Sequence, residues 1–380
     1  MAEGELVTGR ATPEGTRRFA DRFPALPGHF RRPDRLWLSS LGLGTKPGAP
    51  GGVDDLCYRS AVPRVLELGA NVIDTALSYR HQTSERAVGR ALRRAFAENV
   101  ARRDEVFVIS KCGYLAYDAE SIMDPRRYLV RTYVESGLVD PREVVNGVHV
   151  LSPRFVADQI ERSRANLSLE TIDLYLLEDP ELALAAHGPT GFRALLARLF
   201  ETLEEKCASG AIAAYGLSTW HGLLVPYGER GHLSVFELLE TAMQVGGADH
   251  HLRGIALPYS VGQGEARALE SQFGPEAKPT PLFETLRDTG TAVFTAAPLV
   301  HGRAARGLPL FFRQAFPEQR TDAQRCLQFA RSTPGVTTAL VAMRSPEHVD
   351  ENLATAEREP AKSEVIARLF ERARKRAASV

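Results

Sequence analysis

Eight short runs of apolar and β-branched residues alternate with longer segments that carry the helical period. The runs lie at 36–44, 71–75, 106–111, 172–177, 212–218, 254–259, 292–297 and 336–342. The helical segments lie near 55–69, 83–98, 153–167, 191–209, 232–245, 280–290, 320–332 and 346–356. Eight strands, each followed by a helix, are typical of a parallel sheet closed into a (β/α)8 barrel of the TIM type. An open doubly wound sheet is the main alternative, but no G-x-G-x-x-G motif follows an early strand, and we therefore predict the barrel.

The chain is long enough for one such barrel with additions. We assign residues 1–35 to an N-terminal extension and residues 36–380 to the barrel with a C-terminal helical tail. Residues 113–150 form a long connection after the third strand, rich in Asp, Pro, Tyr and Arg. Because loops that follow barrel strands lie on the ligand-binding face, we expect this connection to act as a lid or substrate loop.

Composition excludes several classes of partner. The 47 basic residues balance the 47 acidic ones, so no net charge draws the chain to nucleic acid or an anionic membrane. No stretch approaches the roughly 20 apolar residues of a membrane span, and the N-terminus lacks an apolar signal segment. The four cysteines are far apart and contain no C-x-x-C pair, which predicts reduced thiols and no metal site. We expect a cytoplasmic protein that acts on a small molecule.

Three polar residues follow the second and third predicted strands closely. Asp74 ends the second strand, Tyr79 follows it by five residues, and Lys111 ends the third strand. Because successive strands of a parallel barrel end on one face, these side chains are expected to converge. A phenol beside an ammonium group is expected to have its pKa lowered toward the working range of proton transfer. The three residues therefore predict a device that protonates an oxygen atom.

The resemblance to a known family starts from these residues. The chain resembles the aldo-keto reductase superfamily in four blocks that occur in the family's order: 71–92, 106–111, 214–220 and 335–353. It is most similar to a bacterial and plant subgroup with a long connection after the third strand. The resemblance implies a (β/α)8 barrel that binds NADP(H), with NAD(H) not excluded. It also implies that Tyr79 is the proton donor and that Asp74 and Lys111 support it.

One position departs from the family's catalytic tetrad. The family places a histidine at the end of the fourth strand, and here the segment 176–181 (LLEDPE) puts Glu178 in its place. An ionised glutamate repels a developing oxyanion, whereas a buried, protonated glutamate donates a strong hydrogen bond. In the superfamily this change is associated with reduction of a C=C bond conjugated to a carbonyl, as in the steroid 5β-reductases. We therefore predict reduction of an activated C=C bond or of a carbonyl.

The resemblance also assigns positions around the cofactor and the substrate. Arg344 and Ser345 stand at the start of a helix, whose N-terminus suits a phosphate. Gly302 allows close approach to the pyrophosphate. The expected cofactor-binding residues are Gly44, Thr45, Ser218, Thr219, Leu299, Gly302, Arg344, Ser345, His348 and Asn352. His149 and Trp220 are expected to line the substrate site.

Two further positions weaken the grip on the nicotinamide. A glutamine of the family's sixth strand is matched by Ala256, and a stacking tyrosine of its seventh strand is matched by Ala296. Two other functions therefore stay open beside an oxidoreductase. One is a barrel that binds cofactor with little turnover. The other is a non-redox cyclase or dehydratase that uses Tyr79 and Glu178 as an acid–base pair.

Overall fold

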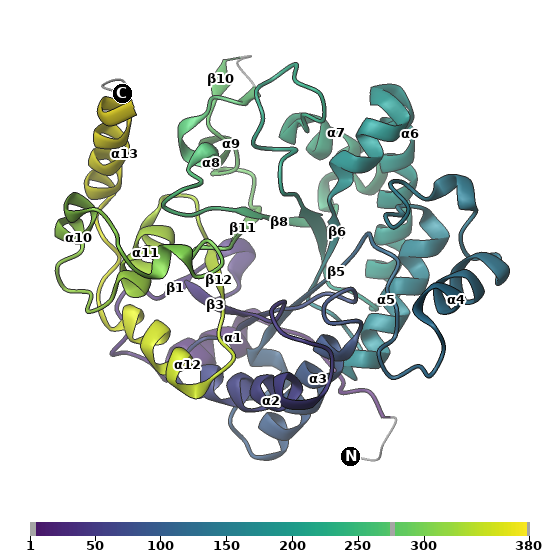
Figure 1. The fold of residues 1–380 in the computed structure, drawn as a ribbon, viewed down its shortest axis with the longest axis horizontal. Helices are drawn as coiled ribbons and strands as arrows, with labels where there is room; N and C mark the ends of the chain where they lie inside the picture. The colour runs from purple at the N-terminus through teal and green to yellow at the C-terminus, as the bar shows by residue number, and fades with distance from the viewer. Residues whose placement is uncertain (1–4, 274–277, 378–380) are drawn as a thin grey trace.

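Eight parallel strands close into a barrel at the centre of the molecule (Figure 1). The computed structural model describes residues 5–273 and 278–377. The order around the barrel is β3-β4-β5-β6-β7-β8-β11-β12, with β12 pairing back to β3. The strands are β3 (Leu41–Gly44), β4 (Val72–Asp74), β5 (Phe107–Cys112), β6 (Leu174–Glu178), β7 (Tyr215–Ser218), β8 (Leu252–Pro258), β11 (Ala292–Ala296) and β12 (Thr338–Ala342). All eight coincide with predicted runs, and the predicted barrel is confirmed.

Alternation of side chains along the strands fills the barrel. Val72, Phe107, Ile109, Leu174 and Leu176 belong to the apolar cluster inside it. Their neighbours one residue away, such as Val108 and Tyr175, belong to the larger core under the helices. Since side chains of a strand alternate between its faces, the residue two positions beyond each inner apolar residue also faces the barrel axis. This rule fixes which strand ends point into the mouth.

The helices form a ring around the strands, seen in Figure 1 from the side at which the strands end. They are α1 (Pro13–Ala20), α2 (Gly52–Glu67), α3 (Thr83–Ala97), α4 (Pro125–Leu129), α5 (Pro153–Leu167), α6 (Pro180–Ala208), α7 (Val235–Gly246), α8 (Glu265–Ala268), α9 (Leu282–Thr285), α10 (Leu310–Ala315), α11 (Asp322–Ser332), α12 (Pro346–Leu353) and α13 (Ser363–Ala377). No helix in the described part of the chain is long and apolar enough to cross a membrane.

Two helices differ from the sequence prediction. α6 begins at Pro180, whereas the sequence analysis predicted a start near residue 191. The prediction missed the first part of the helix because the Gly188–Pro189 step interrupts the helical pattern. At Gly188 the backbone leaves the helical region (φ 68°, ψ 172°), so the helix is kinked there. α9 ends at Thr285, well before Gly290, whose positive φ of 72° ends the turn that leads into β11. The earlier start of α6 brings Glu181 beside the strand ends.

The N-terminal segment closes the far end of the barrel. β1 (Phe30–Arg31) pairs with β2 (Leu38–Ser39) as an antiparallel hairpin. Ala11 joins the apolar cluster inside the barrel, and its N–H donates to Asp173 Oδ1 at 2.6 Å. The same carboxylate forms a buried ion pair with Arg103 at 2.8 Å. The N-terminal extension therefore packs across the bottom of the barrel.

The long connection after β5 is more ordered than its composition suggests. It contains α4, capped by Asp124, followed by a π-helical turn over Val130–Glu135. Tyr133 is fully buried in a small cluster with Val139, Val150 and Phe155. A further antiparallel pair, β9 (Gln272–Phe273) with β10 (Pro279–Thr280), lies in the connection after β8. The connection after β5 is thus packed on the barrel by its own apolar side chains.

Candidate active site

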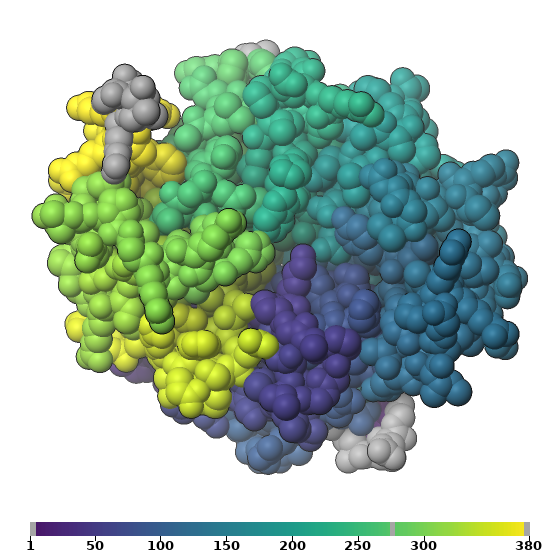
Figure 2. Space-filling view, viewed as in Figure 1, coloured from purple at the N-terminus to yellow at the C-terminus, as the bar shows by residue number. Residues whose placement is uncertain are grey.

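The mouth of the barrel is lined by charged side chains on one side and by small side chains on the other. By the alternation rule, Asp74, Lys111 and Glu178 point inward from the ends of β4, β5 and β6. The inward residues at the ends of the remaining strands are Gly44, Ser218, Pro258, Ala296 and Ala342, with Ala256 one inward position before Pro258. Figure 2 shows this face, where the loop after β3 (purple) approaches the centre. Half of the mouth is therefore free of large side chains.

The three residues predicted at the catalytic centre do meet. Lys111 Nζ donates to Asp74 Oδ1 at 2.5 Å and to the backbone oxygen of Thr75 at 2.8 Å. It also lies 3.2 Å from the hydroxyl of Tyr79. Asp74 and Lys111 are buried, whereas Tyr79 is half-buried. The ion pair thus holds an ammonium group against the phenol.

The protonation of Tyr79 differs from the expectation. Its pKa is raised well above the ordinary value of a phenol, first because the hydroxyl is desolvated and then because Asp74, Glu178 and Asp179 oppose a second negative charge. The positive charge of Lys111 is offset by the negative charge of Asp74, so Lys111 does not reverse the rise in the pKa of Tyr79. Tyr79 is therefore a neutral hydrogen-bond donor. The expectation of a lowered pKa was wrong because it did not take the surrounding carboxylates into account.

Glu178 is buried at the end of β6, with its Oε2 atom unpartnered among the described residues. Burial raises the pKa of Glu178 to about 7, while Lys111 lowers it and Asp179 raises it. The carboxyl group therefore takes up a proton near neutral pH rather than only in acid. A protonated carboxyl donates a hydrogen bond to an oxygen that gains negative charge.

Three residues that the sequence analysis did not select also face this centre. Lys46, an exposed residue after β3, has its Nζ atom 5.6 Å from the ring centroid of Tyr79. Asp179, next to Glu178, accepts a hydrogen bond from the hydroxyl of Tyr114. Asp179 adopts a left-handed conformation (φ 48°) before Pro180. An aspartate–proline pair after a strand was the only available signal, and it resembles an ordinary helix start.

His149, predicted to line the substrate site, is fully buried beside Tyr114, with ring centroids 5.1 Å apart. Its Nε2 atom bonds to the backbone oxygen of Glu178 at 2.9 Å, so Nε2 carries the hydrogen. Nδ1 is then an acceptor, and it is buried without a partner in the described structure. Burial lowers the pKa of His149, which keeps the ring neutral.

Glu181 organises the loop after β7. Its Oε1 atom accepts from Thr219 Oγ1 at 2.8 Å and from the backbone N–H groups of residues 220, 221 and 222 at 3.0–3.3 Å. The hydroxyl of Thr219 therefore faces Glu181, although the sequence analysis placed it at the cofactor. Ser218 ends β7 and faces the mouth. The Trp220 ring stacks on His301 with centroids 6.4 Å apart, so the loops after β7 and β11 touch.

The loop after β11, which carries Leu299 and Gly302, has a strained backbone. Val300 and His301 have φ angles of 49° and 54°, and Gly302 follows with 85°. Glycine adopts this left-handed region without penalty, whereas a β-branched residue does not. Residues in such conformations cost about 1–3 kcal/mol and occur mostly at functional sites. The loop after β11 therefore keeps this conformation at a local energetic cost.

Val300→Gly is expected to raise the free energy of unfolding by about 1 kcal/mol, because relief of the left-handed strain exceeds the lost packing of a half-buried side chain. Val53→Gly is the matched control. Val53 is exposed within α2, where glycine lowers stability by about 1 kcal/mol. Urea denaturation of the three proteins measures both changes. A loss of stability in Val300→Gly as large as in the control contradicts the assigned strain.

The predicted phosphate end lies at the start of α12. Ser345 caps the helix by accepting the N–H of His348 at 3.3 Å. The guanidinium group of Arg344 is half-exposed and forms an ion pair with Asp54 of α2. Gly44 ends β3, and the hydroxyl of Thr45 donates to the backbone oxygen of Asp74 at 2.9 Å. Asn352 is buried in α12. Arg344 therefore joins the loop after β12 to helix α2 rather than standing free.

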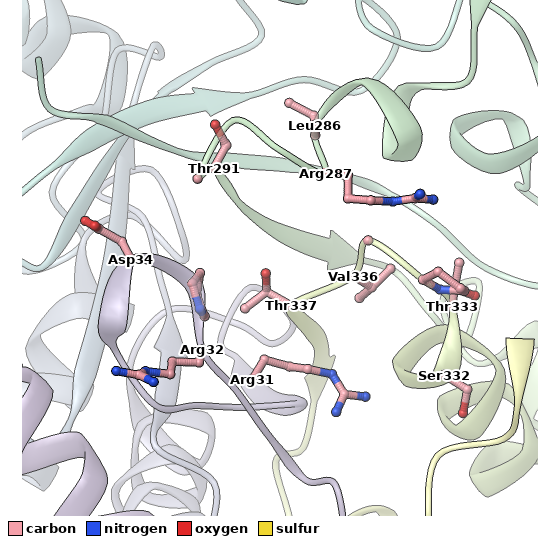
Figure 3. Close-up of a pocket in the computed structure, with 14 residues that line it drawn as sticks. Arg31, Arg32, Asp34, Leu286, Arg287, Thr291, Ser332, Thr333, Val336 and Thr337 are labelled. Atoms are coloured by element: carbon pink, nitrogen blue, oxygen red, sulfur yellow. The ribbon is translucent and has the colours of Figure 1, made fainter. Parts of the chain in front are cut away.

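Two cavities lie at the opposite end of the barrel. One of about 350 Å³ is lined by Phe107, Leu174 and the N-terminal segment. The other, of about 450 Å³, is lined by Arg31, Arg32 and Arg287 among others. In Figure 3 the side chain of Arg32 points to the left, whereas those of Arg31 and Arg287 both extend to the right. In the described residues, no group of His, Cys, Asp and Glu side chains is arranged to hold a metal ion.

Sequence comparisons find similar proteins over part of the chain. The model of the aldo/keto reductase family matches residues 40–223. An NADH-specific methylglyoxal reductase of Escherichia coli (strain K12) is 29% identical over 146 residues, which are 37% of this chain and 38% of that protein. Aldo-keto reductase family 4 member C11 of Arabidopsis thaliana is 27% identical over 153 residues, 40% of this chain and 35% of that protein. The chain thus aligns with little more than a third of these relatives' lengths.

Solved structures agree with the fold over most of the chain. The holo form of aldo-keto reductase AKR11C1 from Bacillus halodurans superposes with a TM-score of 0.60 at 19% identity, covering 91% of this chain and 96% of that one. An aldo-keto reductase of Klebsiella pneumoniae in complex with NADPH gives 0.59 at 20% identity, covering 91% and 94%. Over residues 40–223 the chain is thus similar to the aldo/keto reductase family, and the solved structures share its eight-stranded closed barrel.

Proposed function

We propose that the protein is an oxidoreductase that uses NADP(H), or secondarily NAD(H), to reduce a carbonyl-conjugated C=C bond or a carbonyl of a small or medium apolar substrate. One observation supports the proposal most: a protonatable, unpartnered carboxyl group of Glu178 stands beside a lysine-bound phenol at the mouth of a barrel. The NADPH-bound relative from Klebsiella pneumoniae and the NADH-specific relative from Escherichia coli support a nicotinamide cofactor.

The chain's residues fit such a cofactor. The small inward residues of β3, β7, β8, β11 and β12 leave room for a flat ring opposite Lys111 and Glu178. Ser218 is the polar residue among these small residues. The carboxamide of the nicotinamide ring would therefore have fewer side-chain partners than in the typical family member. When bound, the reduced nicotinamide supplies a hydride. Leu299 and Gly302 would hold the pyrophosphate, and Arg344 with the N-terminus of α12 would hold a 2′-phosphate.

The chain's own residues hold and move the proton. Lys111, fixed by Asp74, keeps the Tyr79 hydroxyl oriented toward the mouth. Tyr79 and protonated Glu178 both donate to the carbonyl oxygen, which gains negative charge as the hydride arrives. Two donors on one oxygen withdraw electrons along a conjugated system, so the β-carbon accepts the hydride. Hydride addition leaves an enolate, whose oxygen receives the hydroxyl proton of Tyr79, and the resulting enol rearranges to the saturated carbonyl compound.

A direct test follows the absorbance of the reduced cofactor. The purified protein is mixed with NADPH or NADH and either an unsaturated ketone or a saturated aldehyde of equal size. The proposal expects loss of absorbance with the unsaturated ketone at a higher kcat/KM than with the aldehyde. Tight cofactor binding without turnover favours a binding barrel, and product without cofactor favours an acid–base enzyme. Either of these results contradicts the proposal.

Activity is expected to fall as the pH rises through 7. The protonated form of Glu178, whose pKa is about 7, is the active one, so kcat declines by about tenfold per pH unit above that value. Glu178→Gln donates at every pH and is expected to abolish this decline. Protonation of Glu178 also affects the stability of the fold. Because the pKa of Glu178 in the folded protein is raised from 4.5, its protonation contributes fully to the free energy of unfolding below pH 4.5, and this contribution is lost as the pH rises through 7.

The pH profile has a matched control in Glu201→Gln, which removes an exposed carboxylate of α6 far from the mouth. That variant is expected to keep the decline in kcat above pH 7. An unchanged decline in Glu178→Gln as well assigns the titration to another group. It would contradict the role given to Glu178.

A further inference from the structure

One ion pair ties the start of α12 to helix α2. Nη1 of Arg344, in the loop between β12 and α12, donates to Oδ1 of Asp54 in the first turn of α2. The second carboxylate oxygen of Asp54 accepts the backbone N–H of Ala49 at 2.7 Å. α2 and α12 lie side by side in the helical ring (Figure 1). Asp54 therefore connects the loop after β3 with the loop after β12.

Asp54 stays ionised without Arg344. The pKa of Asp54 is lowered first by the N–H of Ala49, against a smaller rise from burial, and only then by Arg344. The charge of Arg80 lowers this pKa further. A carboxylate in the first turn of a helix also faces the positive end of the helix dipole. The carboxylate of Asp54 thus keeps its place and its charge when Arg344 moves away.

Arg344, by contrast, depends on Asp54 alone. Its side chain is 48% exposed, and the bond to Asp54 is its single side-chain hydrogen bond in the described part of the chain. An ion pair at an exposed guanidinium group is weak, so another anion can replace it. The two helices are also joined without Arg344, because Arg64 of α2 contacts Asp350 of α12 at 2.7 Å. The packing of α12 on α2 therefore does not require Arg344 to stay on Asp54.

Arg344 stands directly before Ser345, whose hydroxyl caps the N-terminus of α12. The proposed function assigns this place to the 2′-phosphate of NADP(H). A phosphate monoester carries about two negative charges at neutral pH, and a guanidinium group is well suited to bind it. The cation that such a phosphate needs is already bound to Asp54. A 2′-phosphate must therefore displace this carboxylate, and Asp54, still held by Ala49, continues to repel it.

We infer that Asp54 is a specificity-determining residue for the cofactor: it competes with the 2′-phosphate for Arg344 and so narrows the preference for NADP(H) over NAD(H). The inference rests on the proposed function and deepens it, because it assigns the control of cofactor choice to one side chain. NAD(H) carries a hydroxyl group in place of the phosphate, so it leaves the ion pair intact. Asp54 acts through Arg344 and takes no part in the chemistry.

The test measures cofactor binding without a substrate. NADPH and NADH are titrated into the protein, and the fluorescence of the reduced nicotinamide gives both dissociation constants. Asp54→Asn keeps an oxygen for the N–H of Ala49 and removes the charge. We expect this variant to bind NADPH at least about fivefold more tightly, since the phosphate gains an unshared guanidinium group and loses a neighbouring negative charge. The affinity for NADH is expected to change by less than about twofold, which also shows that the variant is folded.

Two further variants locate the effect at the ion pair. Asp350→Asn removes the carboxylate of the other bridge between α2 and α12, which is 51% exposed. It is expected to leave the ratio of the two dissociation constants within about twofold of the natural value. Arg344→Ala is expected to weaken NADPH binding and, in the double variant Asp54→Asn/Arg344→Ala, to abolish the gain from Asp54→Asn. A gain that persists without Arg344 contradicts the competition.

The outcomes separate this inference from the proposed reduction. If both cofactors bind and Asp54→Asn leaves their ratio unchanged, or if Asp350→Asn shifts the ratio as much, Asp54 has no part in cofactor choice, and the proposed reduction is unaffected. If neither cofactor binds to the natural sequence or to any variant, the proposed function is refuted and the inference falls with it. The expected shift in binding, without cofactor oxidation by any carbonyl probe, supports the role of Asp54 and refutes the reduction.

Discussion

Tyr79→Phe is expected to lower kcat by about two to four orders of magnitude, the range that a positioned general acid contributes. The substitution removes one oxygen atom and keeps the ring, which lies 4.8 Å from Lys111 Nζ and 5.6 Å from Lys46 Nζ. Cofactor affinity is therefore expected to stay unchanged, since the hydroxyl contacts Lys111 rather than the small side of the mouth. Steady-state rates and a fluorescence titration with NADPH measure the two quantities separately.

The matched control is Tyr58→Phe, on the neighbouring helix α2. The hydroxyl of Tyr58 donates to the backbone oxygen of Pro47 at 2.9 Å, outside the catalytic centre. Its removal is expected to cost about 1 kcal/mol of stability and to leave kcat intact. If Tyr79→Phe retained the kcat of the natural sequence, Glu178 alone would supply the proton. Weakened cofactor binding as the sole effect would assign Tyr79 to binding rather than to chemistry.

The sequence predicted the barrel because its signal is repeated eight times. Each run between helical segments became a strand, and the parallel closure then brought Asp74 and Lys111 together without further information. Position along a strand is enough to predict such contacts, since the ends of adjacent strands are neighbours. The early start of α6 was missed because Gly188 and Pro189 look like a helix boundary, although the helix resumes after a kink.

The chemistry of the mouth was harder to predict because it depends on loops. Asp179 and Glu181 acquire their roles only when β6, β7 and the connection after β5 are folded together, as the bonds to Tyr114 and Thr219 show. The pKa of Tyr79 depends on the sum of several charges, and the sequence analysis counted only the nearest one, Lys111. Desolvation adds to that sum, and a linear pattern does not reveal it.

The ion pair beneath Tyr79 carries the largest expected effect on stability. Lys111→Met leaves the buried carboxylate of Asp74 without its partner, which is expected to lower the free energy of unfolding by about 3–5 kcal/mol. The pKa of Asp74 is already raised by burial, and Lys111 opposes that rise. Without Lys111 the carboxyl group takes up a proton more readily in the folded state. The stability of the variant is therefore expected to increase as the pH is lowered from 8 to 5.

The double variant Asp74→Asn/Lys111→Met separates folding from chemistry. It removes both charges at once, so no unpaired buried charge is left, and most of the stability lost in Lys111→Met is expected to return. The rate is not expected to return, because the Tyr79 hydroxyl no longer has an ammonium group at 3.2 Å to orient it. Denaturation curves and kcat for the two single variants and the double variant complete the cycle. Recovery of both stability and rate would show that the pair supports only the fold, and Lys111 would then have no part in proton transfer.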